Sequence, residues 1–306
     1  VYKRQGPGRS TGATSLKTGN QETRGRRSSG EPAPKVRPDR SGMLHVELIS
    51  IGRELLRGRI GDGNAQFLAG FFSERGALIR RIVVVDDNDR AIAAALTEAL
   101  ERNPNLVVVS GGLGVAADDR TLAAVAEALG LPLTVSQPVR ELIERGYQRL
   151  YEQRAVRIAG MTEAREKLCR VPVGSDVVPN PLGLSPGVIC KLPGGASVLC
   201  LPGSPDELRA VLEAALPMLK DQGPRQYMSR REVEAPIPDE SALRPMLDGL
   251  SREFSNVSVS SRPVSTRRKG LKVVVSLEST AATEEEADAA TDEALRRLLA
   301  MAAGNL

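Results

Sequence analysis

Short aliphatic runs alternate with helix-period segments in the first part of this chain. The runs have the length of strands and cover Leu44–Ile51, Ala77–Val85 and Leu106–Ser110. Apolar residues recur at helical spacing over residues 64–75, 88–102 and 119–129. Strands that alternate with helices form βαβ units, and wholly apolar strands are buried on both faces. The predicted fold class is therefore α/β, a three-layer sandwich with a mainly parallel sheet.

The pattern changes after Pro224. Strand-like and helix-like segments then follow in the order β-α-β-β-α, at residues 231–237, 240–254, 257–264, 271–277 and 284–302. This order predicts a small α+β domain. We therefore expect an α/β domain over residues 43–224 and the α+β domain over residues 225–306.

Charge is unevenly distributed along the chain. The 306 residues carry a net charge of +4, but residues 1–42 contribute ten Lys and Arg against three Asp and Glu, which leaves the remainder slightly acidic. The first 42 residues have few large apolar side chains, so we expect a disordered basic tail. The first methionine is Met43. The tail is thus either translated upstream sequence or a basic arm that binds polyanions weakly.

Composition excludes several classes of protein. Aromatic residues make up 3% and Trp is absent, which disfavours a base-stacking nucleic-acid surface. No apolar run approaches the roughly 18 residues of a membrane span. Three scattered cysteines and a single histidine, His45 within a predicted strand, cannot form a structural zinc site. We expect a cytoplasmic protein in which His45 is structural.

Two predicted strands end in residues that are typical of catalytic or ligand-binding sites. Asp86 follows the second strand, and the third strand leads into a glycine-rich turn, Ser110, Gly111, Gly112, Leu113 and Gly114, before the next helix. Glycines allow backbone N–H groups to approach a ligand, and a helix N-terminus favours anions. The turn lacks the lysine motif of a P-loop and the third glycine of a dinucleotide fingerprint. It predicts a phosphate or other oxyanion ligand.

Asp118 and Asp119 follow this turn directly. A carboxylate beside a phosphate is repulsive unless a divalent cation bridges the two, and Asp86 would emerge at the same sheet edge. A helix N-cap would account for an aspartate here without any ligand. Both interpretations stay open at this point.

Four motifs, in order along the chain, resemble those of one family. They are the opening IGxELLxG at residues 51–58 with Asn64, the GGLG and DDxT of residues 111–121, the NPxGxxPG of residues 180–187 and the LPGxPxE of residues 201–207. Together they resemble the molybdopterin-binding (MoCF biosynthesis) domain in the competence/damage-inducible protein A (CinA) family.

This resemblance implies a pocket for a pterin or nucleotide phosphate. It implies that Asp86 and Asp119 are catalytic and hold a divalent metal ion such as Mg²⁺. The substrate-binding residues that it implies are Ser110, Gly111, Gly112, Leu113, Gly114, Thr121, Asn180, Gly183, Pro186, Gly187, Gly203, Ser204, Pro205 and Glu207. The implied activity is metal-dependent hydrolysis of ADP-ribose or a similar phosphoanhydride. The alternatives are adenylyl transfer to molybdopterin and a catalytically degenerate protein that only binds its ligand.

The chain departs from the family pattern at several positions. Val115 and Ala116 replace the usual Pro-Thr, which removes a loop hydroxyl, Arg53 replaces an acid, and Gly63 replaces the usual Thr before Asn64. The resemblance also implies a KH-like second domain, but no GxxG clamp is found, so nucleic acid is not an expected partner. It further implies a homo-oligomer, and we expect the family's deamidase domain to be absent.

Overall fold

The computed structural model describes residues 43–219, 226–235, 239–266 and 270–303. The predicted tail, residues 1–42, lies outside this part of the chain. So does the predicted domain boundary at Pro224, which stays a prediction.

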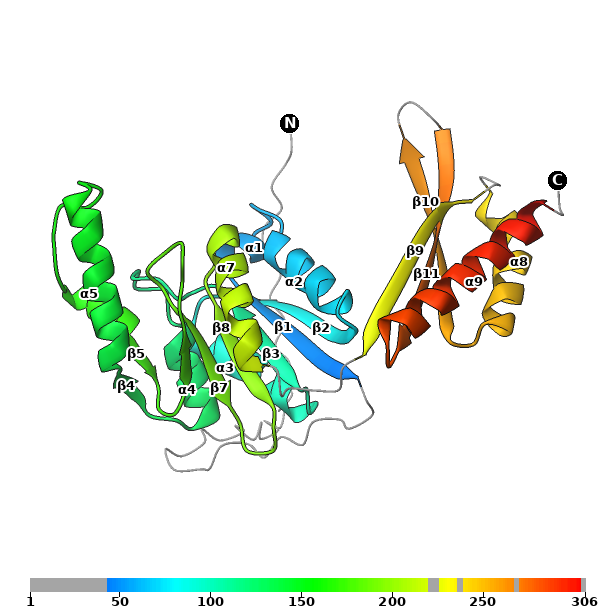
Figure 1. The fold of residues 1–306 in the computed structure, drawn as a ribbon. Coiled ribbons are helices and arrows are strands. Elements are labelled where there is room, and N and C mark those ends of the chain that lie inside the picture. The colour runs from blue at the N-terminus through cyan, green and yellow to red at the C-terminus, as the bar shows by residue number, and fades with distance from the viewer. Residues whose placement is uncertain (1–42, 220–225, 236–238, 267–269, 304–306) are drawn as a thin grey trace, which may run out of the picture. The chain divides into compact units, whose positions relative to one another are not determined.

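A six-stranded sheet forms the centre of the first part of the chain (Figure 1). Its order is β2-β1-β3-β8-β7-β6, with strands β1 (Leu44–Ile51), β2 (Ala77–Val85), β3 (Leu106–Ser110), β6 (Asp176–Val178), β7 (Gly187–Lys191) and β8 (Ser197–Leu201). The four strands β2, β1, β3 and β8 are parallel, whereas β7 runs antiparallel to β8 and β6 antiparallel to β7. The first three strands have the predicted limits, and the mainly parallel α/β sheet is confirmed.

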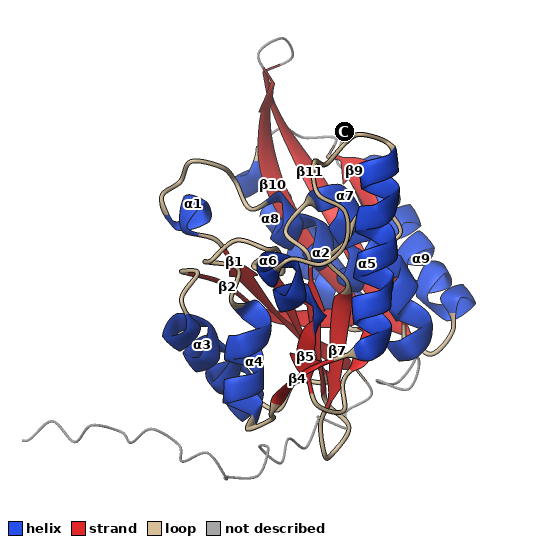
Figure 2. Ribbon diagram, turned by 90° about the vertical axis from the view of Figure 1, so that its left-hand side faces the viewer, coloured by secondary structure: helices blue, strands red, loops and turns tan. Residues whose placement is uncertain are grey.

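Helices cover both faces of this sheet. One face packs against α2 (Gly63–Ser73) and α7 (Pro205–Ala215), and the other against α3 (Asp89–Glu101), α4 (Thr121–Leu129) and α5 (Gln137–Glu152). Figure 2 shows α3 beside α4. In β3, Leu106 and Val108 point to the α2/α7 core while Val107 and Val109 point to the α3/α4 core. Because alternate residues of a strand face opposite sides, its unbroken apolar run fills two cores. The three-layer prediction is confirmed.

An excursion between α4 and β6 had no predicted elements. It contains β4 (Leu133–Val135), α5, α6 (Glu163–Glu166), the short 3₁₀ helix η1 (Lys167–Cys169) and β5 (Arg170–Pro172). Strands β4 and β5 pair antiparallel in a separate two-stranded ladder. Leu168 and Cys169 of η1 are buried in the α3/α4 core, so η1 is anchored to the main body. Two further short helices are α1 (Arg53–Leu56) and η2 (Leu216–Leu219).

The last part of the described chain forms an antiparallel sheet in the order β10-β11-β9. Its strands are β9 (Tyr227–Glu234), β10 (Val257–Thr266) and β11 (Gly270–Ala281). Helices α8 (Glu240–Glu253) and α9 (Glu284–Ala303) share a core with this sheet, centred on Val273, Val275 and Leu277. The predicted α+β arrangement is confirmed, although β9 begins four residues before the predicted position. The KH-like assignment stays a prediction.

His45 lies in β1 and is 3% exposed. Its backbone N–H donates to Asn105 Oδ1 at 2.8 Å, and its ring Nε2 lies 3.3 Å from an Arg80 nitrogen. The histidine thus packs at the beginning of β1, at the opposite end of the strand from the glycine-rich turn. This position agrees with its expected structural role.

Candidate functional site

Three parallel strands end side by side at one edge of the large sheet. Ser50 of β1 is paired in register with Ser110 of β3, which is paired with Leu201 of β8. The glycine-rich turn leaves β3 at this point, and the Gly111 N–H donates to the Leu201 carbonyl at 3.0 Å. Ligands of open α/β sheets bind at the carboxyl ends of the strands, where this turn lies.

The glycines of the turn are required by its packing. Gly111 and Gly112 have φ values of 101° and 65°, in the left-handed region. A Cβ on Gly111 would lie 2.5 Å from the Ile51 carbonyl oxygen, and one on Gly112 would lie 2.3 Å from Thr121 Oγ1. Thr121 Oγ1 donates to the Gly111 carbonyl at 2.7 Å. Gly111, Gly112 and Thr121 therefore fix the shape of the turn against β1 and α4.

Asp119 holds the second half of the turn. Its Oδ2 accepts the Ala116 N–H at 2.8 Å, and a Cβ on Gly114 would lie 2.4 Å from the same oxygen. Helix α4 begins at Thr121, two residues after the predicted start, and its N-cap residue is Arg120. Asp119 is thus a loop residue, and the N-cap explanation does not apply to it.

Asp86 forms an ion pair with Arg53. Arg53 Nε donates to Asp86 Oδ1 at 2.9 Å, and Arg53 Nη2 lies 3.0 Å from Asp87 Oδ1. Hydrogen bonds from Asp87 and Arg53 lower the pKa of Asp86, whereas burial raises the pKa of Asp87. The arginine that departs from the family motif is therefore the partner of both predicted strand-end carboxylates.

A cavity of about 200 Å³ opens beside the glycine-rich turn. Five of its lining residues were predicted as site residues, namely Gly112, Leu113, Gly114, Asp119 and Pro186. Seven others were not, namely Arg120, Leu122, Ala123, Leu133, Lys167, Leu168 and Arg170. Asp86 is not among the lining residues, so the structure does not bring Asp86 and Asp119 onto this one cavity.

The cavity carries excess positive charge. Arg120 forms a two-pronged ion pair with Asp89 of α3. Lys167 Nζ donates to the Ala116 carbonyl, and among the described residues no carboxylate forms an ion pair with Lys167 or Arg170. Burial lowers the pKa of Lys167, and the charge of Asp119 opposes that shift. Three basic residues thus line the cavity, two of them without a carboxylate partner among the described residues, against the single lining carboxylate of Asp119.

The loop of residues 180–187 reaches the cavity through Pro186. Asn180 Oδ1 accepts the N–H groups of Leu182 and Gly183 at 3.1 and 2.9 Å, and its Nδ2 donates to Glu207 Oε2 at 2.6 Å. A Cβ on Gly183 would lie 2.2 Å from that same Glu207 oxygen. These contacts account for Asn180, Gly183 and Glu207 as residues that shape the loop.

The remaining predicted residues surround the site without lining this cavity. Gly187 begins β7, where a Cβ would lie 2.4 Å from Val211 Cγ1. Gly203 packs close to Gly111, and its carbonyl accepts from Asn64 Nδ2 at 2.8 Å. Ser204 and Pro205 form the exposed N-terminus of α7, while Ser110 is 4% exposed at the end of β3.

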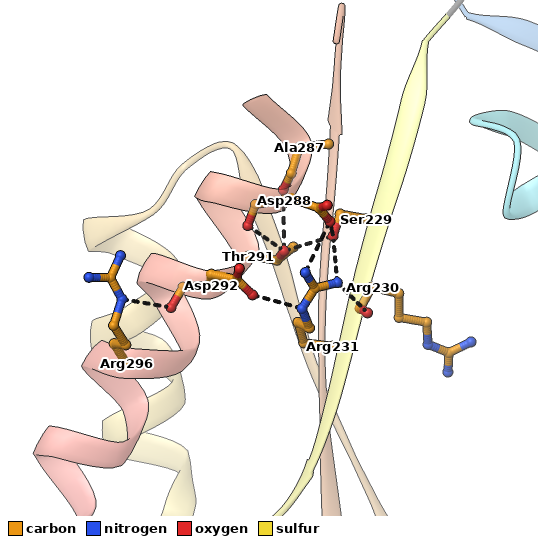
Figure 3. Close-up of polar contacts among 8 residues, drawn as sticks. All are labelled: Ser229, Arg230, Arg231, Ala287, Asp288, Thr291, Asp292 and Arg296. Atoms are coloured by element: carbon orange, nitrogen blue, oxygen red, sulfur yellow. Dashed lines mark hydrogen bonds and ion pairs between the residues drawn. The ribbon is translucent and has the colours of Figure 1, made fainter. Parts of the chain in front are cut away.

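A second polar cluster lies on the small sheet (Figure 3). Arg231 of β9 reaches α9, where its Nη2 donates to Asp288 Oδ1 at 3.0 Å and its Nε to Asp292 Oδ1 at 2.7 Å. Ser229 Oγ donates to Asp288 Oδ1 at 2.6 Å and lies 2.8 Å from Thr291 Oγ1. Because Arg231 of β9 forms ion pairs with both aspartates of α9, the cluster joins these two elements.

Lys167 and Arg170 were not predicted as site residues, because their segment lies outside the four family motifs. They flank Leu168 and Cys169, which are buried, so η1 must lie against the core and its neighbours must lie at the rim. Two basic residues on either side of an apolar pair are a common pattern, and nothing in it indicates which cavity the side chains approach.

The fold and the site together define an α/β protein with a cavity lined by basic side chains at the carboxyl edge of its sheet. Residues 47–221 match the family described as "Probable molybdopterin binding domain", and the chain belongs to this family. None of the helices in the described part of the chain combines the length and apolar character needed to cross a membrane.

Relatives share most of the chain. A protein of Thermococcus kodakarensis is 38% identical over 221 residues, 72% of this chain and 86% of that protein. A protein of Pyrobaculum calidifontis is 35% identical over 258 residues, 82% of this chain and 93% of that protein. The solved structure of CinA from Thermoplasma acidophilum, described as of unknown function, is 34% identical with a TM-score of 0.52, and covers 57% of this chain and 98% of that one. These likenesses support a CinA-like member of the family.

Proposed function

We propose that the cavity beside the glycine-rich turn binds the phosphates of a nucleotide or pterin, and that the chain hydrolyses a phosphoanhydride such as ADP-ribose. The observation that carries the proposal is the pairing of a glycine turn with two cations, Lys167 and Arg170, that have no carboxylate partner among the described residues. Ion pairs and hydrogen bonds to phosphate are stronger in a partly dehydrated cavity than in water.

The size of the cavity limits what it encloses. Pockets that enclose a drug-sized ligand measure about 300–1,000 Å³, so the observed 200 Å³ accommodates a diphosphate or one ring system, and the rest of a nucleotide would extend beyond it. Leu122, Leu133 and Leu168 contribute apolar surface to the lining, which suits a flat ring. Membership of the molybdopterin-binding family supports a pterin or nucleotide as that ligand.

The predicted divalent cation fits this site only in part. Within the described ranges no three His, Cys, Asp or Glu side chains are grouped to hold a metal ion, and Asp86 and Asp87 are paired with Arg53. Asp119 is the carboxylate that remains beside the cavity. Mg²⁺ in phosphate-transfer sites often uses one or two carboxylates together with substrate phosphates. A bound cation would be held by Asp119 with the substrate and would neutralise charge on the phosphates.

The residues of the chain have separate parts in the proposed reaction. Lys167 and Arg170 bind the phosphate oxygens, and the turn residues Gly112 and Gly114 let the backbone approach them. Water adds to one phosphorus as the bridging P–O bond breaks, so that ADP-ribose and water yield AMP, ribose 5-phosphate and protons. Asp119 orients the reacting groups from the turn.

The test is incubation of the purified chain with ADP-ribose and Mg²⁺, with AMP measured by chromatography. We expect AMP from the wild type and at least a tenfold lower rate from Asp119→Asn. Asp118→Asn is the matched control, because Asp118 neighbours Asp119 but does not line the cavity. Absence of AMP, or undiminished AMP from Asp119→Asn, contradicts hydrolysis at this site.

Two alternative functions predict different results for the same purified chain. Adenylyl transfer to molybdopterin, which is equally compatible with the family, releases pyrophosphate from ATP only when the pterin is present. A binding protein in which Val115 and Ala116 have replaced the usual loop residues binds nucleotide calorimetrically and forms no product. The expected cytoplasmic location and homo-oligomeric state stay predictions.

A further inference from the structure

The two carboxylates at the end of β2 share one cationic partner, which leaves the group with a single negative charge. Arg53 contacts Asp86 at 2.9 Å and Asp87 at 3.0 Å, so a single guanidinium bridges both side chains. Arg53 occupies Oδ1 of each carboxylate, so a divalent cation bound to these two oxygens would have to displace the arginine. The arginine therefore occupies the electrostatic position that the sequence prediction gave to a metal ion.

The cavity has the opposite imbalance. Lys167 Nζ and Asp119 hold Ala116 from both sides, because Lys167 donates to its carbonyl and Asp119 accepts its N–H. A lysine ammonium has three donors and an arginine guanidinium has five. Among the described residues the Lys167 side chain has only the Ala116 carbonyl as hydrogen-bond partner, and the Arg170 side chain has none. Several charged donors therefore remain for a ligand.

The charges of the lining residues then indicate whether a divalent cation or a phosphate enters the cavity first. The Arg120–Asp89 pair is neutral, which leaves Lys167 and Arg170 against Asp119 among the residues that line the cavity, while Asp118 acts on Lys167 from outside that lining. A divalent cation that enters before the phosphate adds to this positive excess, whereas a diphosphate offsets it. The electrostatic field of the ligand-free cavity therefore favours an anion and disfavours a metal ion.

We infer that this chain binds its phosphate-bearing ligand without a divalent cation, through the charges of Lys167 and Arg170. This inference rests on the proposed function of the cavity, and it concerns binding rather than any later chemical step.

The test is calorimetric titration of the full chain with inorganic pyrophosphate, once with EDTA and once with Mg²⁺. We expect dissociation constants within twofold of each other. Binding that appears only with Mg²⁺ overturns the inference and leaves the proposed phosphate site standing. Absence of pyrophosphate binding in both buffers overturns the proposed site itself.

Variants separate charge from loop positioning. Lys167→Gln keeps a hydrogen-bond donor toward Ala116 but removes the charge, and we expect it and Arg170→Met each to weaken pyrophosphate at least tenfold and to flatten the salt dependence. Lys191→Met is the matched control, because Lys191 lies on β7, pairs with Asp176 and does not line the cavity. Unchanged affinity in Lys167→Gln contradicts the role of its charge.

Electron paramagnetic resonance of Mn²⁺ tests directly whether Arg53 keeps a divalent cation away from Asp86 and Asp87. The wild type without phosphate is expected to bind no Mn²⁺ below millimolar concentration, whereas Arg53→Gln, which frees Asp86 and Asp87, is expected to bind it. Tight Mn²⁺ binding by the wild type, or none by the variant, contradicts the assignment of Arg53.

Discussion

The polar cluster on the small sheet and the one beside the cavity contain similar side chains, but the two clusters differ in how their charges are paired. On the small sheet, Arg231 bridges Asp288 and Asp292, so each of these three charged side chains has a partner of opposite sign. At the edge of the large sheet, Lys167 and Arg170 face a cavity with Asp119 alone. The difference teaches that the pairing of charges, more than their number, separates a cluster that joins two elements of the fold from the proposed ligand site.

Burial sharpens this contrast. Thr291 and Ser229 of the small-sheet cluster are 0% and 5% exposed, and both hydroxyl groups have hydrogen-bond partners. A buried polar group costs little once it is hydrogen-bonded. In the cavity, burial lowers the pKa of Lys167, which means that its charged form is less well solvated there than in water. A phosphate would restore that solvation.

The largest expected effect comes from the turn. Gly111→Ala places a Cβ 2.5 Å from a backbone oxygen at a φ of 101°, and we expect it to lower the free energy of unfolding by about 3 kcal/mol and to abolish pyrophosphate binding. Gly58→Ala is the control, because its φ is 64° but no atom lies within 4 Å of the new Cβ, so strain acts there without a clash. Urea unfolding measures both, and equal losses would refute the role of close packing at Gly111.

A smaller effect is expected on the small sheet. Arg231→Met removes ion pairs to Asp288 and Asp292, whose side chains are 45% and 51% exposed, so solvent screening limits the loss in unfolding free energy to about 1 kcal/mol. Pyrophosphate affinity should be unchanged. A variant that unfolds like the wild type but loses ligand binding would reverse the roles that we assign to the two clusters.

The smallest effect is a change in pH dependence. Hydrogen bonds from Ser229 and Arg231 lower the pKa of Asp288 below its ordinary value of 3.8. A carboxyl with a lowered folded-state pKa adds stability above its unfolded value, and this stability is lost as the pH falls through the folded value. The difference in stability between wild type and Asp288→Asn should therefore be constant near pH 6 and shrink below about pH 4. Thermal unfolding across that range measures it, and a pH-independent difference would contradict the assignment.

Much of the fold could be predicted from local pattern. The strands Leu44–Ile51, Ala77–Val85 and Leu106–Ser110 have their predicted limits because a central parallel strand needs apolar residues on both faces. Strand β9 begins four residues before the predicted segment 231–237 and ends at Glu234, because it is an edge strand whose polar, exposed residues give a weak strand pattern. Strands β4 and β5 had no predicted counterparts, since their pairing joins segments more than 30 residues apart. Helix α5 was missed although its apolar residues, Val139 and Ile143 among them, recur at helical spacing within the segment itself.

The site was predictable where chemistry is local. The glycine turn and Asp119 follow one strand, so their proximity is a consequence of chain connectivity. Lys167 is 51 residues from Ala116, and only the return of η1 to the core brings them together. The ion pair between Arg53 and Asp86 likewise joins residues that follow two different strands. The sequence around either residue does not indicate which partner it has.

The sequence by itself determined the layered sheet and the position of the glycine-rich turn, because hydrophobic period and backbone freedom are properties of neighbouring residues. Only the tertiary structure decided which charges are cancelled and which remain for a ligand. Electrostatic balance depends on distance in space, and folding alone sets Arg53 against Asp86 and leaves Lys167 beside the cavity.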